Sequence, residues 1–331
     1  MKLAIVKLSA MGDIIHAMVA LQFIKKQIPN IQIDWFVEKA FASVLEYNPD
    51  IDNIYKLDLK SIKKNKKNLF SQIKLIKQYS KNDYDLIIDG QGLIKSAIVS
   101  KLLGKNIAGF DKNSIREGVA SFFYNTKVNI AYDENTIDRN AKVLSSPLKF
   151  EITKNEIIEK EKFLFFENEE KIIYDYLSKD KKNIIFVVGS TWESRNYPKE
   201  KFAKIADELK ENCLIVWGNE DERQKALWIE EKSSYTKAMP KINLNSLKAL
   251  IANSELLIGN DTGPTHMAWG LNIPSITIFG PTPINRVYQT SINKVVKSNS
   301  EVNHFKLDKN DFSIVEIDEN LIISMARVLL Y

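Results

Sequence analysis

Short apolar runs alternate with longer segments of helical spacing along the whole chain. The runs cover residues 3–8, 31–37, 54–59, 86–89 and 107–110, then 184–188, 213–217, 255–258 and 275–279. This alternation predicts βαβ units and parallel sheets. A charged stretch over residues 151–171 interrupts the pattern once, so we expect two α/β units in tandem.

The length of the chain also favours two domains. A single hydrophobic core stops growing at roughly 250 to 300 residues, and the chain has 331. We expect a Rossmann-like domain over residues 1–170 and a second over residues 171–315. Residues 316–331 carry apolar positions at helical spacing, which predicts a helix that packs across a domain surface.

The composition, 44% hydrophobic and 27% charged residues, is typical of a globular protein. The only cysteine, Cys213, excludes an internal disulfide and fits a reducing compartment. The first apolar run is too short for a signal peptide and ends at Gly12 and Asp13. No stretch approaches the roughly 20 apolar residues of a membrane span. We therefore expect a cytoplasmic protein, either soluble or attached peripherally to a membrane.

The positive charge is concentrated in one segment. The net charge is +5, but residues 60–81 hold eight lysines and no carboxylate. Such a segment is either a solvated helix face or a surface for an anionic partner, which would be a phosphorylated substrate or a membrane. Nucleic acid is not expected, because few aromatic residues lie between the lysines.

Chemistry is expected at the strand-to-helix turns, since open α/β sheets bind ligands beyond the carboxyl ends of their strands. The first turn, residues 8–13, has neither the three spaced glycines of a dinucleotide site nor the Lys-Ser/Thr of a phosphate loop. Gly12 leaves room for close approach. Asp13 is either a stabilising first-turn acid or a general base that the helix dipole keeps charged.

The second turn, residues 188–198, is rich in hydroxyl groups. Ser190 and Thr191 supply short neutral donors, and Arg195 supplies a charged planar fork. These groups suit a diphosphate. A loop that only caps the helix after Pro198 is the equally open alternative.

The third turn, residues 259–266, gives the strongest signal. Gly263 leaves room for a phosphate at a helix start, and Thr262 and backbone N–H groups are donors. Asp261 and His266 complete the Asp-Thr-Gly-x-x-His grouping, in which His266 is a further candidate donor. Asp-Thr-Gly also occurs in aspartic proteases, but those are all-β proteins and the pattern here is α/β.

Together these segments resemble the lipopolysaccharide heptosyltransferases, which are GT-B glycosyltransferases. The resemblance covers nearly the whole chain and rests on residues 6–13, 88–97, 116–125, 217–218, 260–263 and 279–282. It implies two Rossmann-like domains with parallel sheets facing across a cleft. It also implies an inverting transfer of heptose from ADP-L-glycero-β-D-manno-heptose to Kdo of Kdo-lipid A, with Asp13 as the base.

The resemblance assigns the donor-binding residues one by one. They are Gly12, Ser190, Thr191, Arg195, Glu222, Asp261, Thr262, Gly263 and His266. Ser190 and Thr191 stand where relatives have two threonines, and Arg195 stands where they usually have lysine. Glu222 matches a carboxylate that binds ribose, although Glu220 competes with it for that role.

On the acceptor side the resemblance points to seven cations that would face Kdo carboxylates and lipid A phosphates. They are Lys60, Lys63, Lys64, Lys67, Lys95, Arg116 and Arg139. The enzyme would work at the cytoplasmic face of the inner membrane, where the anionic surface is a further partner.

No metal or other cofactor is expected. The triplets Asp50-Ile-Asp52 and Asp83-Tyr-Asp85 resemble metal sites, but each precedes a predicted strand, where acidic turn residues are ordinary. The helix dipole, the hydroxyl groups and Arg195 would stabilise the leaving ADP instead. Two alternatives stay open: heptosyltransferase II or another nucleotide-sugar transferase, and a non-catalytic nucleotide-binding protein.

Overall fold

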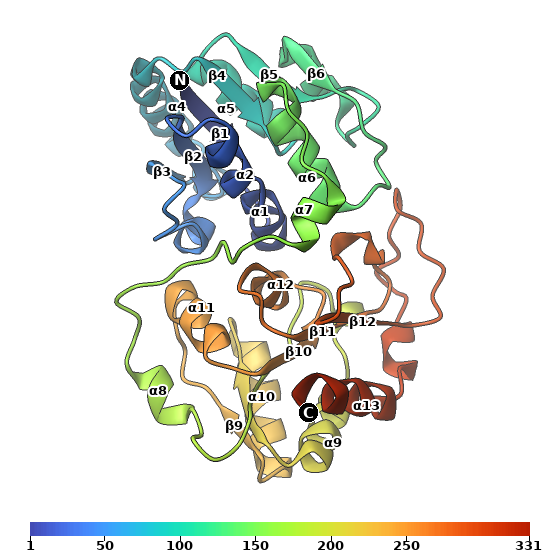
Figure 1. Cartoon of the computed structure of the whole chain (residues 1–331). Helices are drawn as coiled ribbons and strands as arrows, with labels where there is room; N and C mark the ends of the chain where they lie inside the picture. Colours follow the sequence, from blue (N-terminus) through green and yellow to red (C-terminus); the bar gives the residue numbers. More distant parts are fainter. The chain divides into compact units, whose positions relative to one another are not determined.

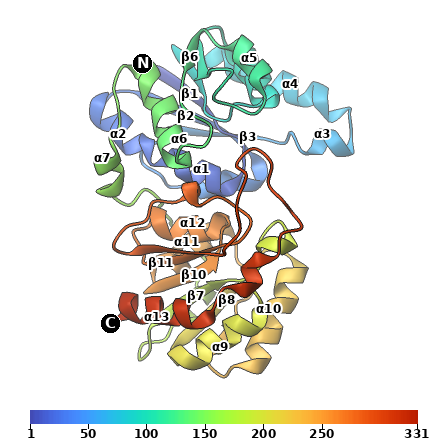
Figure 2. The ribbon, with the colours of Figure 1, turned by 90° about the vertical axis from the view of Figure 1, so that its right-hand side faces the viewer.

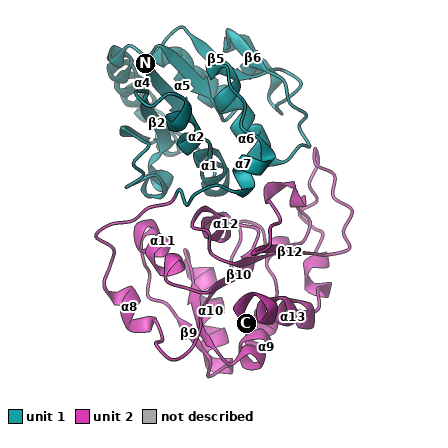
Figure 3. Cartoon of the chain, in the orientation of Figure 1, with its two compact units in different colours: residues 1–163 teal, residues 164–331 magenta. Residues whose placement is uncertain are grey.

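The structure, a computed structural model, describes the backbone of residues 1–331, and only the side chain of Lys63 lies outside the described part. The chain forms two compact units, residues 1–163 and residues 164–331 (Figure 3). Both units are parallel α/β structures, which confirms the predicted fold class. Among the described residues, no helix has the length and apolar composition needed to cross a bilayer.

The first unit is built on a six-stranded parallel sheet of order β3-β2-β1-β4-β5-β6. Its strands are β1 Lys2–Val6, β2 Gln32–Glu38, β3 Asn53–Leu57, β4 Leu86–Asp89, β5 Ile107–Phe110 and β6 Thr126–Val128. Successive strands are added on one side of β1 up to β3 and on its other side from β4 onward. The switch point therefore lies between β1 and β4, where Val6 pairs with Asp89. Such a switch point opens a crevice at the carboxyl ends of the strands.

Helices cover both faces of this sheet. On one face α6 (Thr136–Ser145) packs against α1 (Met11–Met18) and α2 (Ala20–Gln27) (Figure 1). On the other face α4 (Asn68–Tyr79), α5 (Ile94–Leu103) and the short η3 (Gly118–Phe123) share one apolar core with the strands. The remaining short helices are η1 Lys39–Val44, α3 Ser61–Lys64, η2 Ser80–Asn82, η4 Ser146–Leu148 and α7 Lys154–Ile158.

The second unit repeats this topology with a sheet of order β12-β11-β10-β7-β8-β9. Its strands are β7 Asn183–Val187, β8 Asn212–Val216, β9 Thr236–Ala238, β10 Leu256–Asn260, β11 Ser275–Phe279 and β12 Asn293–Lys297. Here the switch point lies between β7 and β10, where Gly259 pairs with Val187.

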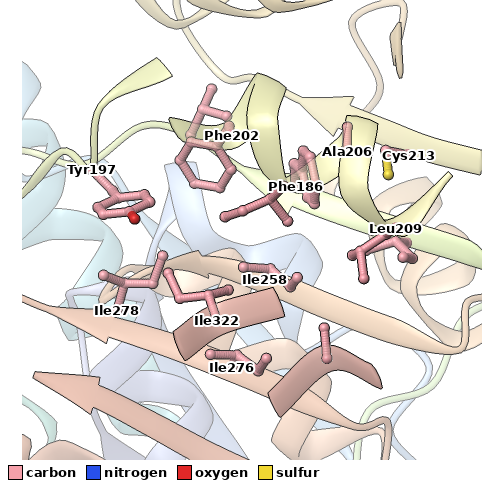
Figure 4. Close-up of a cluster of buried hydrophobic side chains, with 14 of the residues drawn as sticks. Phe186, Tyr197, Phe202, Ala206, Leu209, Cys213, Ile258, Ile276, Ile278 and Ile322 are labelled. Atoms are coloured by element: carbon pink, nitrogen blue, oxygen red, sulfur yellow. The ribbon is translucent and has the colours of Figure 1, made fainter. Parts of the chain in front are cut away.

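The helices of the second unit follow its strands. They are α8 Ile172–Tyr176, η5 Glu193–Arg195, α9 Lys199–Leu209, α10 Glu220–Lys232, α11 Leu244–Ala252, α12 Gly263–Gly270, η6 Ile284–Arg286, η7 Ser313–Glu316 and α13 Glu319–Leu330. The terminal α13 packs on α9, and its Ile322 joins Ile258, Ile276 and Ile278 in the core of this unit (Figure 4).

The structure contains elements that the hydrophobic pattern did not predict. Strands β6, β9 and β12 are sheet edges, and each carries lysine among its few residues, so their sequences lack a buried apolar run. The charged stretch contains α7, which begins with a reciprocal cap between Thr153 and Glu156. Helix α1 begins at Met11 rather than near Ile14.

Candidate active site

The acid turn, residues 7–13, leaves the carboxyl end of β1 at the switch point of the first unit. Asp13 occupies the third position of α1, and its Oδ2 accepts a hydrogen bond from the backbone N–H of Ala10 at 3.3 Å. Gly12 and Asp13 are both partly exposed. The carboxylate therefore stands at a helix start, where the dipole favours negative charge, and a substrate can reach it.

A glutamine from the turn after β4 holds the acid turn in place. Gln91 Oε1 accepts hydrogen bonds from the backbone N–H groups of Leu8 and Ser9, both at 3.0 Å. Asp89 fixes this second turn, since its Oδ1 accepts the N–H groups of Gln91 and Gly92 at 2.9 and 3.1 Å. The two turns that flank the switch point are thus one hydrogen-bonded assembly.

A buried lysine is the first residue of the acid turn. Lys7, 5% exposed, donates to the carbonyl of Gly90 at 2.7 Å and to Oδ1 of Asn140 on α6 at 2.9 Å. Burial lowers the pKa of Lys7, while the negative charges of Asp13 and Asp89 act in the opposite direction. The charged form of a buried lysine needs such partners. Lys7 was not among the predicted site residues, although a polar residue at the end of a buried strand was an available signal.

Two of the predicted acceptor cations come from neighbouring segments. The N–H of Ile94 donates to Oε2 of Glu117 at 2.8 Å, which ties the first turn of α5 to the segment that carries Arg116. Lys95 and Arg116 are both exposed, and neither has a hydrogen-bond or ion-pair partner among the described residues. Both remain available to an anionic acceptor.

Arg139 is placed differently from the other predicted cations. It is buried, and its guanidinium donates to the backbone carbonyls of Ser114 at 2.6 Å and Ala131 at 2.5 Å. It also lies over the rings of Phe110 and Tyr132. Burial lowers its pKa. These contacts indicate a brace for the loop around β6, and direct acceptor binding by Arg139 stays an untested prediction.

The other four predicted acceptor lysines precede α4 in the chain. Lys60 is anchored, since its N–H donates to Oε1 of Glu38 at 2.9 Å and its Nζ lies 4.8 Å from the centre of the Phe41 ring. Lys64 and Lys67 are exposed. The side chain of Lys63, another predicted acceptor cation, lies outside the described residues.

In the second unit, one carboxylate lies beside the turns that follow β7 and β8. Glu222 accepts the N–H of Gly218 at 2.7 Å, and it packs so closely on Gly189 that a Cβ there would lie 2.2 Å from it. Glu220 instead bonds Arg223 at 2.9 Å on the exposed side of α10. Ribose binding by Glu222, with Glu220 as the alternative, stays a prediction.

Asp261 organises the turn after β10. Its carboxylate accepts from Arg195 at 2.6 Å and Thr282 at 3.0 Å, and it lies 3.1 Å from Nε2 of His266. Burial would raise the pKa of Asp261, but the hydrogen bond from His266 and the positive charges of Arg195 and Arg286 outweigh it and hold the pKa below its usual range. Thr282 and Arg286, which follow β11, were not among the predicted site residues.

Several donors around this turn lack partners. Among the described residues, the buried donors without a hydrogen bond include three groups from the turn after β7, Ser190 Oγ, Ser194 Oγ and Arg195 Nε, and one from the last residue of β10, Asn260 Nδ2. Buried polar groups are normally paired. A ligand with several acceptor oxygens, such as a diphosphate, would supply the missing partners.

The start of α12 and one flanking hydroxyl complete this anion site. Thr262 and Gly263 are partly exposed at the first turn of α12, and Thr191 is exposed beside Ser190. A helix start with free N–H groups attracts anions. We call the turns after β7 and β10 the anion turns.

The two acidic triplets lie elsewhere. Asp52 accepts the N–H of Ile33 at 2.7 Å, and Asp85 accepts that of Lys2 at 2.7 Å. Both therefore cap the amino ends of strands, the edge of the sheet opposite to the acid turn. No group of three His, Cys, Asp or Glu residues within the described part of the chain is arranged to hold a metal ion.

Comparison with known proteins identifies the family of this chain. Residues 72–313 match the model of glycosyltransferase family 9 (heptosyltransferase). Lipopolysaccharide heptosyltransferase 1 of Campylobacter coli is 40% identical, over 99% of both chains. The enzyme of that name from Pseudomonas aeruginosa is 29% identical over 85% of this chain and 79% of its own length.

A solved structure shares the fold. The Escherichia coli heptosyltransferase WaaC with ADP-2-deoxy-2-fluoro heptose has a TM-score of 0.80 at 23% identity, and 99% of each chain is covered. The architecture of two parallel α/β units is therefore that of GT-B transferases. The chain belongs to glycosyltransferase family 9, the heptosyltransferase family.

Proposed function

We propose that this chain is an inverting heptosyltransferase that moves L-glycero-D-manno-heptose from ADP-heptose to Kdo of Kdo-lipid A in the lipopolysaccharide inner core. The observation that carries the proposal is the set of unpaired buried donors at the anion turns, in a chain 40% identical to a lipopolysaccharide heptosyltransferase 1. That relative aligns over 99% of both chains, so the whole protein can be compared.

The donor would bind to the second unit. The diphosphate of ADP would accept from Ser190, Thr191 and Arg195 and from the helix start at Thr262 and Gly263. Glu222 would bind the ribose, because a carboxylate can accept hydrogen bonds from two hydroxyl groups at once. Gly12 would leave room for a sugar at the acid turn. This charge and dipole arrangement stabilises negative charge as it develops on the leaving ADP.

Asp13 would act on the acceptor. Its carboxylate would take the proton from a Kdo hydroxyl as that oxygen attacks the anomeric carbon of the heptose and the bond to ADP breaks. A single displacement of this kind inverts the anomeric configuration. General-base catalysis is typically worth roughly 100-fold or more in rate.

The acceptor would be held by cations of the first unit. Lys95 and Arg116 would face the Kdo carboxylates, and Lys60, Lys63, Lys64 and Lys67 the lipid A phosphates or the anionic surface of the membrane. The argument for a charged ligand is the absence of carboxylates from residues 60–81. Peripheral attachment at the cytoplasmic face of the inner membrane is part of this proposal.

Two measurements test the proposal together. Calorimetric titration should show ADP binding more tightly than GDP or UDP. With ADP-heptose as donor, the enzyme should use Kdo-lipid A and not an acceptor that already carries the first heptose. Transfer only to the second acceptor would favour heptosyltransferase II. Tight binding of ADP without transfer to either acceptor would favour a non-catalytic nucleotide-binding protein.

A further inference from the structure

One face of the first unit combines basic and apolar side chains on its outward surface. It is formed by α3, α4, α5 and η3, and α4 lies beside α5 (Figure 2). The segment of residues 60–81, which contains α3 and α4, holds eight lysines, and α5 holds two more, Lys95 and Lys101. None of the three segments 60–81, 94–103 and 118–123 contains Asp or Glu. We call this surface the basic apolar face.

The same face exposes large apolar side chains. Six of them are 40 to 80% exposed: Leu69, Phe70, Ile94, Ile98, Val119 and Phe122. Spacing places them together within each element, because Ile94 and Ile98 are one helical turn apart and Val119 and Phe122 are one 3₁₀ turn apart. The hydrogen bond from Ile94 to Glu117 then brings the start of α5 next to η3.

The opposite face of the sheet provides a control within the same unit. Helices α1, α2 and α6 cover it, and none of the described residues in these three helices is an exposed large apolar side chain. Exposed aromatic and aliphatic residues that are concentrated on one face, and framed by cations, are typical of a surface that binds a partner. Phe122 is 80% exposed to water, which is unfavourable on a face that only contacts solvent.

We propose that the basic apolar face docks on an anionic lipid bilayer, with Phe70, Phe122 and their apolar neighbours inserted among the headgroups and the lysines on the lipid phosphates. Lysines attract an anionic surface, and apolar side chains add affinity by leaving water. Charge selects the bilayer over a second copy of this chain, because two such faces would repel each other. The inference deepens the membrane part of the proposed function, but it does not require catalysis.

Sedimentation with vesicles tests the proposal without any acceptor present. The protein should bind vesicles of phosphatidylcholine with phosphatidylglycerol, and it should not bind phosphatidylcholine alone. The double variant Phe70→Ser, Phe122→Ser should bind anionic vesicles about tenfold or more weakly. The matched control is Phe305→Ser in the second unit, which replaces a phenylalanine that is 73% exposed and should bind like the unchanged protein.

A fluorescent label distinguishes insertion from purely electrostatic contact. Cys213, the only cysteine, is buried, so a polarity-sensitive dye can be attached at Phe122→Cys and, as control, at Val328→Cys on α13, an exposed position. Anionic vesicles should shift the emission to the blue for the first label and leave the second unchanged. Equal responses of both labels would overturn the proposal.

Other results would also overturn it. The unchanged protein could stay in the supernatant with anionic vesicles, or the double Phe variant could bind as well as the control. A dimer that dissociates in the double variant would identify a second copy of the chain as the occupant instead. Transfer to a deacylated, water-soluble Kdo acceptor should be unchanged in the double variant, and this assay reports a failure of the proposed function separately.

Discussion

The two units share one topology and differ in the charge gathered at their switch points. In the first unit Asp13 lies in a turn whose backbone N–H groups at Leu8 and Ser9 donate to the amide oxygen of Gln91, and its charge acts on the buried Lys7. In the second unit the turns after β7 and β10 surround one buried carboxylate, Asp261, with cations and hydroxyl groups. The same crevice position is thus suited to a base in one unit and to an anion in the other.

This difference shows what the fold decides and what the side chains decide. Strand order places both sets of turns at carboxyl strand ends. The acid of the first unit is partly exposed and can reach a substrate, whereas Asp261 is 2% exposed and serves the groups around it. Replacing each acid by the corresponding amide tests whether Asp13 and Asp261 have these different roles.

Asp261→Asn should have the largest effect, which should appear as a loss of stability. Removing one partner of a buried ion pair costs about 3 kcal/mol, because the other charge is left buried without compensation, and Arg195 would lose its carboxylate. We expect chemical denaturation at neutral pH to show this loss in the free energy of unfolding. The exposed pair of Glu220 and Arg223 supplies the control, since Glu220→Gln should change stability little.

The pH dependence of that loss has a definite sign. The pKa of Asp261 is lower in the folded protein than its ordinary value of 3.8, so its stabilising contribution is present above the ordinary value and disappears as the pH falls through the folded one. The unfolding free energies of the variant and the unchanged protein should therefore converge in acid. A difference that stays constant below pH 4 would show that packing, not charge, causes the loss.

Asp13→Asn should have the next largest effect, and on turnover alone. The amide cannot accept the proton of the acceptor hydroxyl, so kcat should fall at least roughly 100-fold. Because the change lies in the first unit, the affinity for ADP measured by calorimetry should stay the same. Near-normal turnover would remove Asp13 from the mechanism, and weaker ADP binding would show that the acid turn serves the donor as well.

The hydrophobic pattern predicted the central strands and failed at the edges. Residues 86–89 and 275–279 were predicted with their observed bounds because such strands are buried on both faces. The edge strand β9, Thr236–Ala238, has only three residues and one lysine, and its pairing with β8 depends on tertiary contacts. Local sequence does not carry that information.

The residues of the candidate site were likewise predicted where the signal is local and missed where it depends on tertiary contacts. Ser190, Thr191 and Asp261 lie two or three residues after apolar runs, so position along the chain was enough to select them. Lys7 and Asn140 are 133 residues apart and meet only because α6 returns to the first sheet. For Arg139 the sequence supplied a charge but not the carbonyls of residues 114 and 131 that surround it. The missing information is long-range in each case.

Changing Gln91 tests whether the acid turn depends on the bond between the two turns, and its effect should be the smallest. Gln91→Leu removes the acceptor for the N–H groups of Leu8 and Ser9, and loss of each such bond costs about 1 kcal/mol. Displacing Asp13 slightly should lower kcat by about tenfold with ADP affinity unchanged. Gln91→Glu keeps an oxygen acceptor and should restore most of the turnover. If the two variants were equally slow, Gln91 would act through its amide group on the substrate, and the acid turn would hold its place without it.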